Sequence, residues 1–211
     1  MASYIFDFDG TLVDSMPTYV GAMLSVLDRF GIPHDGELVK TITPLGYAGT
    51  AKYFTTLGVP LTVEEILAMV DDYAMDAYAN RVQAKKHVKE TLEALRARGD
   101  DLHVLTASPH RMLDPCLKNN GMFELFDNIW SCEDFGTSKA DPHIYEMAAE
   151  RIGRRVEEVI FLDDNLDADR TAKRAGMTVY GVFDESSRAY ADDIRAATDR
   201  YITDFTELLE D

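Results

Sequence analysis

The chain has 211 residues, of which 46% are hydrophobic and 28% charged, and its formal net charge at pH 7 is −17. This length and composition fit one or two globular domains with a substantial core. The acidic excess disfavours binding to nucleic acid and to anionic membranes, because both need clustered Lys and Arg. Cys116 and Cys132 form no metal-binding pattern, and no charged leader or long apolar run is present, so we expect a cytoplasmic location.

The stretch from residue 4 to residue 15 combines a short strand with a pair of acids. Apolar residues 4–6 predict a buried strand, and Asp7 and Asp9 follow it just before Gly10. Alternation along an extended backbone places both carboxylates on one side, at the strand end where α/β sheets bind ligands. Two close carboxylates repel, so the pair indicates a divalent cation, a shared proton or both. The alternative is a solvated acidic turn.

The next part of the chain has a helical pattern without a strand. Asp14 and Ser15 are suited to cap a helix, and apolar residues at helical spacing continue to Gly31. The segment 62–65, Thr-Val-Glu-Glu, is a capping box that opens another helix. We therefore expect an all-α insert of four helices over residues 16–87.

After Val88 the pattern alternates between strands and helices. Strands are expected at 102–105, 128–130, 159–162 and 178–182, followed by a closing strand and helix between residues 201 and 209. Helices are expected between these strands, before Gly99, around Cys116, from Pro142 to Ile152 and around Ala172. Alternating units of this kind predict an α/β fold with a doubly wound parallel sheet. Its core would comprise residues 1–15 and 88–211, interrupted by the helical insert.

Polar side chains stand at two further strand ends and before one helix. The second core strand ends in Thr106, Ala107 and Ser108, and hydroxyl and N–H donors at a helix start suit a phosphate group. The strand at 159–162 ends in Asp163 and Asp164, and Lys139 precedes the helix at Pro142. Taken singly, such residues are also typical of helix caps and of a solvated surface lysine.

Together these residues resemble the four motifs of the haloacid dehalogenase-like hydrolases. Residues 7–15, DFDGTLVDS, resemble the first motif, DxDGTLxDS, of the phosphatase and phosphomutase branch. Thr106, Lys139 and the pair Asp163-Asp164 resemble the second, third and fourth motifs in the expected order, although Ala140 stands where many relatives have Pro. The resemblance implies a Rossmann-like hydrolase core with a mobile helical cap, Mg²⁺ as cofactor and a small phosphorylated metabolite as substrate.

The resemblance also implies a role for each motif residue. Asp7 would attack phosphorus and form an aspartyl-phosphate, and Asp9 would act as general acid and base. Mg²⁺ would be held by the Asp7 carboxylate, the Asp9 backbone carbonyl and Asp164, with Asp163 as a weaker ligand or a neighbour of the ligands. The phosphate contacts would come from Thr106, Ala107 and Lys139, with Ser108 beside them. Some phosphatases carry another Asp at the position of Ala168, and the flanking Asp167 and Asp169 remain unassigned between that site and a solvated helix start.

Substrate recognition is expected in the helical insert and beside the second motif. The segment 43–47, Thr-Pro-Leu-Gly-Tyr, has the composition of a recognition loop, with Tyr47 and the nearby Lys52 as candidates. A helix-connecting loop with a surface lysine is an equal alternative. His110 is a further candidate for substrate contact, and the alternative is an ordinary helix-start residue.

Three functions are compatible with this pattern. A Mg²⁺-dependent phosphatase resembling phosphoglycolate phosphatases, as a monomer or small homo-oligomer, is favoured because Asp9 can protonate a leaving oxygen. A β-phosphoglucomutase-like isomerase is the second, but Tyr19 stands where those mutases carry His. The third is a non-catalytic regulatory module, which would be expected to have lost Asp7 or Asp9. Phospho-acceptor domains of response regulators use similar residues, but they place the acceptor at a later strand.

Overall fold

The computed structural model describes residues 1–42 and 45–210, which form two compact units. The sheet unit comprises Met1–Asp14 and the chain from Gln83 onward, and the helical unit comprises Ser15–Val82. Residues 83–87 were expected in the insert but belong to the sheet unit. The reason is backbone pairing, because Asp14 N–H donates to Gln83 O and Lys85 N–H donates to Leu12 O, both at 3.0 Å.

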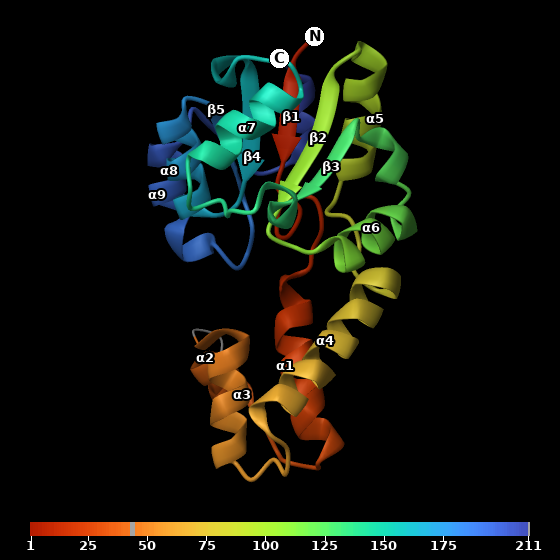
Figure 1. The fold of residues 1–211 in the computed structure, drawn as a ribbon, viewed down its shortest axis with the longest axis vertical. Helices are drawn as coiled ribbons and strands as arrows, with labels where there is room; N and C mark the ends of the chain where they lie inside the picture. Colours follow the sequence, from red (N-terminus) through yellow and green to blue (C-terminus); the bar gives the residue numbers. More distant parts are fainter. Residues whose placement is uncertain (43–44, 211) are drawn as a thin grey trace. The chain divides into compact units, whose positions relative to one another are not determined.

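The sheet unit is built on six parallel strands in the order β3-β2-β1-β4-β5-β6 (Figure 1). These strands are β1 (Ser3–Phe6), β2 (Asp101–Thr106), β3 (Asn128–Ser131), β4 (Val159–Asp163), β5 (Thr178–Val182) and β6 (Arg200–Ile202). Because β2 and β4 lie on either side of β1, the chain reverses its winding direction at the first strand. The predicted doubly wound α/β sheet is confirmed.

Helices cover both faces of this sheet, as the burial of its central strands on both sides requires. On one face Ile5 packs with side chains of α7 and α8, while on the other Phe6 contacts Phe126 and Phe205. The helices are α5 (Val88–Arg98), α6 (His110–Asn119), α7 (His143–Arg151), α8 (Leu166–Ala175) and α9 (Ala191–Ala197). The sequence pattern missed α9, which buries only Ile194, and the expected closing helix is the short 3-10 turn Phe205–Leu209.

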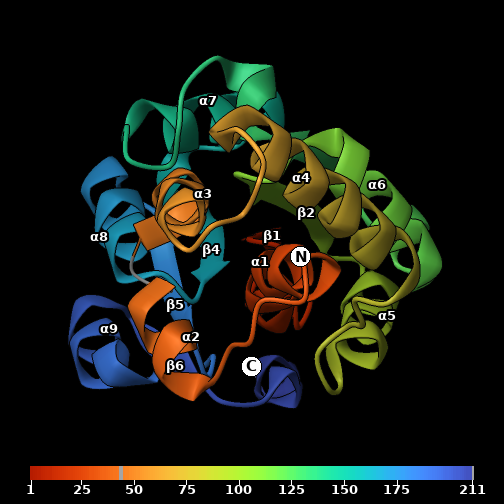
Figure 2. The same cartoon turned by 90° about the horizontal axis from the view of Figure 1, so that it is seen from below.

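The helical unit contains α1 (Met16–Arg29), α2 (Gly36–Ile42), α3 (Gly46–Thr56) and α4 (Val63–Asn80), drawn from red to yellow in Figure 2. The capping box at α4 forms as predicted, with Thr62 Oγ1 accepting from Glu65 N–H and the Glu65 carboxylate accepting from Thr62 N–H. The core of the helical unit is apolar, with Met23, Leu27 and Phe54 fully buried. Within the described residues, no helix is both long and apolar enough to span a bilayer.

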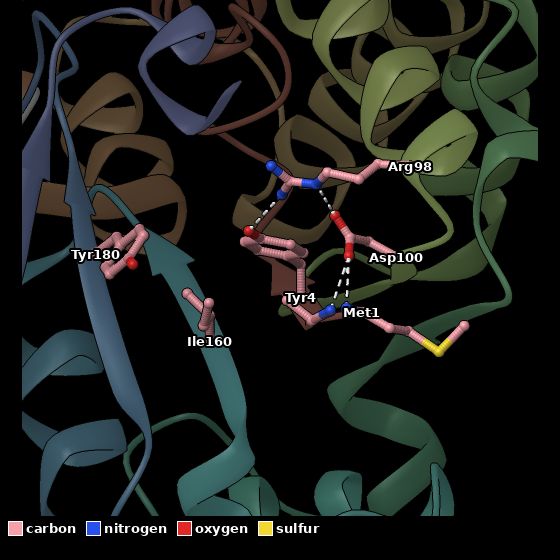
Figure 3. A pocket seen from close by; sticks show the side chains of 7 residues that line it. Met1, Tyr4, Arg98, Asp100, Ile160 and Tyr180 are labelled. Carbon is pink, nitrogen blue, oxygen red and sulfur yellow. Dashed lines mark hydrogen bonds and ion pairs between the residues drawn. The ribbon is translucent and has the colours of Figure 1, made fainter. Parts of the chain in front are cut away.

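A hollow of about 360 Å³ opens at the end of the sheet where the strands begin (Figure 3). Arg98 lies in its wall and donates to the Asp100 carboxylate at 2.6 Å and to the Tyr4 hydroxyl at 3.2 Å. The remaining lining residues are Met1, Ala2, Ile160 and Tyr180. The charge of Arg98 is therefore balanced locally, at the end of the sheet opposite to the motif residues Asp7 and Asp163.

His103 is a buried titratable group in the sheet. It lies on β2 with 3% of its surface exposed, and its ring stacks on Trp130 at a centroid distance of 5.7 Å. Its Nδ1 lies 3.0 Å from the Asn128 amide nitrogen and so accepts, which places the proton on Nε2, and Nε2 has no hydrogen-bond partner among the described residues. Burial lowers the pKa of His103, and the neutral ring is the form that the fold stabilises.

We predict that His103 makes stability depend on pH in the acidic range. Since the pKa of His103 is lower in the folded state than in the unfolded state, its contribution is complete above the unfolded pKa and is lost as the pH falls. Between about pH 7 and pH 5, wild type should lose on the order of 1 kcal/mol more unfolding free energy than His103→Gln in urea titrations. His143→Gln, at an exposed histidine, is the matched control. Parallel pH profiles for wild type and His103→Gln would contradict the assignment.

Candidate active site

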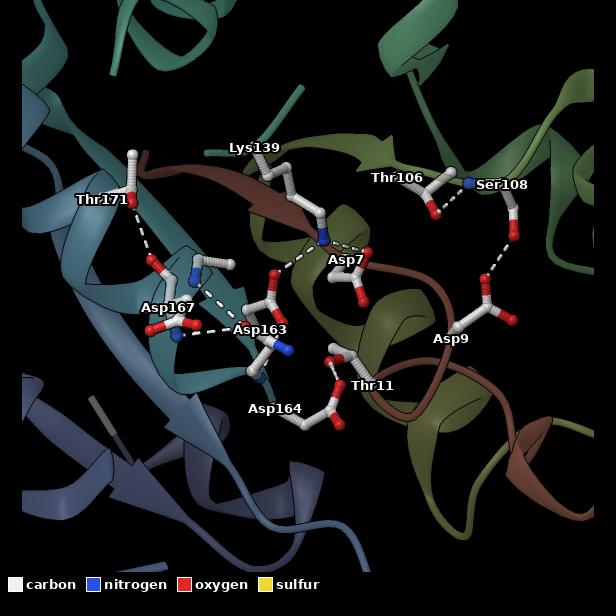
Figure 4. A network of polar contacts seen from close by, with 12 residues as sticks. Asp7, Asp9, Thr11, Thr106, Ser108, Lys139, Asp163, Asp164, Asp167 and Thr171 are labelled. Carbon is white, nitrogen blue, oxygen red and sulfur yellow. Dashed lines mark hydrogen bonds and ion pairs between the residues drawn. The ribbon is translucent and has the colours of Figure 1, made fainter. Parts of the chain in front are cut away.

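The polar motif residues meet at the carboxyl ends of the three adjacent strands β2, β1 and β4 (Figure 4). Asp7 directly follows β1, Thr106 ends β2, and Asp163 ends β4. Parallel strands bring these ends to one edge of the sheet, and the change of winding direction at β1 leaves room between the flanking connections. These three strand ends therefore meet, as a parallel sheet with adjacent β2, β1 and β4 requires.

Three carboxylates form a buried cluster at this edge. Oxygens of Asp7, Asp163 and Asp164 all lie within 4.8 Å of one another, and the three residues are 5%, 0% and 8% exposed. The ammonium of Lys139 reaches into the cluster, donating to Asp7 Oδ1 and, at 2.7 Å, to Asp163 Oδ2. Asp163 also accepts from Asn165 N–H at 2.8 Å, so its carboxylate orients Lys139 and the start of α8 together.

The Lys139 ammonium balances only part of the charge that this cluster can carry. When all three carboxyls are ionised, they and the ammonium leave two negative charges in a buried site, which a divalent cation would neutralise. Burial and the neighbouring carboxylates raise the pKa of Asp7 well above its usual range and raise the pKa of Asp164 to about 7. Burial opposes the charge on Lys139, but the attraction of Asp163 and Asp7 outweighs it and raises its pKa. An all-oxygen ligand set of this kind fits Mg²⁺.

The turn after β1 is shaped around Asp164. Gly10 has φ +76°, and a Cβ at this position would lie 2.6 Å from Asp164 Oδ2. Both the backbone conformation and the contact therefore require glycine here. The next residue, Thr11, is fully buried and donates to Asp164 Oδ1 at 3.2 Å. Gly10 and Thr11 of the first motif thus hold the carboxylate of Asp164, which belongs to the fourth motif.

The end of β2 faces Asp9. Ser108 Oγ donates to Asp9 Oδ2, and Ser108 N–H donates to Thr106 Oγ1 at 3.1 Å. Figure 4 shows Asp9 on the Ser108 side, apart from the Asp7 and Lys139 pair. Asp9 is therefore close to the candidate phosphate loop of residues 106–108, in which Ala107 is exposed, and its carboxylate is not part of the acidic cluster. The assignment of its backbone carbonyl to a metal stays a prediction.

The candidate recognition residues lie outside this cluster. Both ring nitrogens of His110 face carboxylates at 2.8 Å, Asp114 and Asp134, and these bonds raise the pKa of the ring. Tyr47 and Lys52 belong to α3 of the helical unit, where the Tyr47 ring contacts the Tyr19 ring. Thr43 and Pro44 of the proposed recognition loop lie outside the described residues. A role in substrate recognition stays a prediction for His110, Tyr47 and Lys52.

The structure adds residues that the sequence pattern did not identify. Lys85 donates to the Gly10 carbonyl at 2.6 Å, although its place in a Lys-Lys-His run suggests an exposed side chain. Asp169 is fully buried, whereas Asp167 is exposed, so the solvated helix start holds for Asp167 alone. Neither carboxylate oxygen of Asp169 has a hydrogen-bond partner among the described residues, and burial raises its pKa to about 9. No local signal separates Asp169 from Asp167, because helical phase at a helix start shifts with the exact first residue.

Comparison with known proteins identifies the family. A model described as haloacid dehalogenase-like hydrolase matches residues 4–182. A phosphorylated carbohydrates phosphatase from Thermotoga maritima is 26% identical over 184 residues, which cover 86% of this chain and 85% of that protein. A phosphoglycolate phosphatase from Salmonella typhi is 28% identical over 200 residues, with 84% of this chain and 79% of that protein covered.

A solved structure extends the likeness to the whole fold. It is a Thermotoga maritima protein assigned as a β-phosphoglucomutase, which superposes with a TM-score of 0.88 over 100% of this chain and 99% of its own, at 23% identity. The family match spans all four motif positions that meet at the sheet edge. The chain belongs to the haloacid dehalogenase-like hydrolase family.

Proposed function

We propose that this protein is a Mg²⁺-dependent phosphatase that hydrolyses a small phosphomonoester through a phosphorylated Asp7. Hydrolysis of phosphorylated small molecules is the activity that the family and the phosphatase names of its relatives support. The observation that carries the finer proposal is the buried cluster of Asp7, Asp163 and Asp164 around Lys139. In this cluster the candidate nucleophile Asp7 is paired with the Lys139 ammonium. The remaining negative charge of the carboxylates is one that a divalent metal would balance.

The proposed reaction has two displacement steps at phosphorus, and each residue of the site has a role in them. In the first, an Asp7 oxygen forms a bond to phosphorus, the bond to the ester oxygen breaks, and Asp9 gives that oxygen a proton. In the second, water attacks phosphorus, Asp9 takes its proton, and the bond to Asp7 breaks to release phosphate. Lys139 keeps the Asp7 oxygen oriented and balances its charge, and the donors around Thr106 hold the phosphoryl oxygens.

The metal would be held by the carboxylates of Asp7 and Asp164 and by the backbone carbonyl of Asp9. When bound, Mg²⁺ supplies positive charge next to the phosphoryl oxygens and so reduces the repulsion between a dianionic ester and an anionic nucleophile. The raised pKa values of Asp7 and Asp164 support this assignment, because they express the cost of gathering carboxylates without a cation.

A sugar-phosphate mutase is the second candidate function. A protein assigned as a β-phosphoglucomutase shares this fold, and at 23% identity that likeness carries the fold alone. Against the mutase function stands Tyr19, at the position where the resembling mutases have His. Its hydroxyl lies 3.4 Å from Ile42 O and from Thr50 Oγ1, inside the helical unit, and this position therefore lacks the imidazole that those mutases carry. We therefore favour hydrolysis.

The first test is phosphate release from a panel of small phosphomonoesters that includes phosphoglycolate and several sugar phosphates. We expect release with Mg²⁺ and loss of release with EDTA, restored when Mg²⁺ is added in excess. One ester should stand out in kcat/KM. Metal-independent release, or silence across the panel, would contradict the proposal, and exchange of labelled phosphate between sugar positions would instead support a mutase.

Substitution of the nucleophile tests the covalent step. Asp7→Asn should reduce turnover by at least about 10⁴-fold, because an amide cannot form the phosphorylated intermediate. The fold should persist, since the variant removes one charge from a crowded cluster, and circular dichroism with urea unfolding would check this. Phosphate release by a folded Asp7→Asn variant at a rate near wild type would exclude Asp7 as the nucleophile.

The general-acid role of Asp9 predicts a dependence on the leaving group. Asp9→Ala should lower kcat by roughly 10²- to 10⁴-fold for an alkyl phosphate, whose leaving oxygen needs a proton. The decrease in the rate of the first step should be much smaller for p-nitrophenyl phosphate, because its leaving group departs as an anion. Single-turnover measurements with both esters separate this step from the later hydrolysis. Equal losses for both leaving groups would argue against proton donation by Asp9.

A further inference from the structure

Lys85 makes three hydrogen bonds beside the acidic cluster. Its ammonium donates to Gly10 O at 2.6 Å, to Phe183 O at 2.7 Å and to Asp184 Oδ2 at 3.0 Å. The side chain of Lys85 is 20% exposed and that of Asp184 is 7% exposed, so the ion pair is largely removed from water. Three acceptors in fixed places satisfy the three N–H bonds of the ammonium.

These acceptors come from both sides of β4, the strand that Asp164 directly follows. Gly10 belongs to the turn after β1, and Phe183 and Asp184 follow β5. In the sheet, β4 lies between β1 and β5. Lys85 therefore joins the two segments that flank the carboxyl end of β4. Its own backbone is held as well, because Lys85 N–H donates to Leu12 O at 3.0 Å.

The Gly10 turn cannot move without affecting Asp164. Gly10 packs so closely on the Asp164 carboxylate that even a Cβ would approach to 2.6 Å. A shift of the turn would open this contact and the hydrogen bond from Thr11 to Asp164. The hold of Lys85 on the Gly10 carbonyl is thus transmitted to the carboxylate through a direct packing contact.

Lys85 also balances a second buried charge. Burial opposes the ionisation of Asp184, but hydrogen bonds from Ser186 and the ammonium of Lys85 outweigh it and lower the pKa of Asp184. Asp184 Oδ1 accepts from Ser186 N–H at 2.9 Å and from Ser186 Oγ at 2.6 Å, which leaves Oδ2 for Lys85. Without Lys85, Asp184 would be a buried anion that has lost the cation it is paired with, next to an already acidic site.

We propose that Lys85 is a positioning residue for the proposed reaction, which holds the Gly10 turn and the segment after β5 in place and thereby fixes Asp164 relative to Asp7. The role rests on the proposed function, because it matters for catalysis only if these carboxylates share a cation. Among the described residues, the Lys85 ammonium bonds to Gly10, Phe183 and Asp184 and to neither Asp7 nor Asp9. It acts through Gly10 and Thr11, and its loss would loosen the cation site rather than remove a ligand.

The test compares Lys85→Met with Lys85→Arg and with Lys86→Met, a matched control that removes the same charge from the exposed neighbour. Three quantities are measured: hydrogen exchange of the metal-free protein in the peptide containing residues 8–13, the Kd for Mg²⁺ by calorimetry, and kcat and KM at saturating Mg²⁺. Lys85→Met should exchange faster in this peptide, bind Mg²⁺ about tenfold or more weakly, and lose kcat with little change in KM. Lys85→Arg should recover part of the Mg²⁺ affinity, and Lys86→Met should match wild type.

Wild-type exchange and Mg²⁺ affinity in a folded Lys85→Met variant would overturn the proposal, and so would equal effects of Lys86→Met. If Lys85→Met does not fold, Asp184→Asn weakens the same tie while keeping the side-chain shape, and it should shift exchange and Mg²⁺ affinity in the same direction. Wild-type protein that binds Mg²⁺ but releases no phosphate from any ester would contradict the proposed function alone. The exchange and Mg²⁺ measurements would still decide the role of Lys85.

Discussion

The contact on which the site depends is that of one buried ammonium, Lys139, with carboxylates that would otherwise repel one another. Asp7, Asp163 and Asp164 come from two strand ends, and each is almost completely buried. Gathering like charges away from water is costly, so the arrangement persists only where backbone and side-chain hydrogen bonds hold every partner. The same cost makes the site receptive to a divalent cation, because a bound cation relieves it.

The sheet supplies the rigid frame that such a cluster needs. Parallel pairing of β2, β1 and β4 sets three polar strand ends side by side, and packed helices on both faces leave these strands little freedom to shift. Around this frame, short-range contacts set individual groups: Gly10 and Thr11 against Asp164, and Ser108 against Asp9. In the proposed reaction this separation of the Asp9 carboxylate from the cluster is useful, because a carboxyl group that gives and takes a proton should not itself be a ligand of the cation beside Asp7.

Two lysines of this acidic protein work inside the sheet unit rather than on its surface. Lys139 orients the candidate nucleophile, and Lys85 connects the segments on either side of β4. Both have carboxylate partners of low exposure, a setting in which an ion pair is sensitive to the loss of either member. Most of the other acids are exposed and contribute to the net charge of −17.

Local sequence determined the strands, most helices and the motif residues of this protein, because hydrophobic periodicity and the Asp7 to Ser15 motif act over a few residues. Parallel alternation then brought Asp7, Thr106 and Asp163 to one edge by topology alone. Tertiary structure decided what depends on distant contacts: the assignment of residues 83–87 to the sheet unit, the burial of Asp169, and the orientation of Lys85 toward Gly10. Nothing in the local sequence of a Lys-Lys-His run shows whether a lysine makes hydrogen bonds inside the protein or is exposed to solvent. Phe183 and Asp184, the partners of Lys85, lie almost a hundred residues away in the chain, and only the folded sheet brings them within reach.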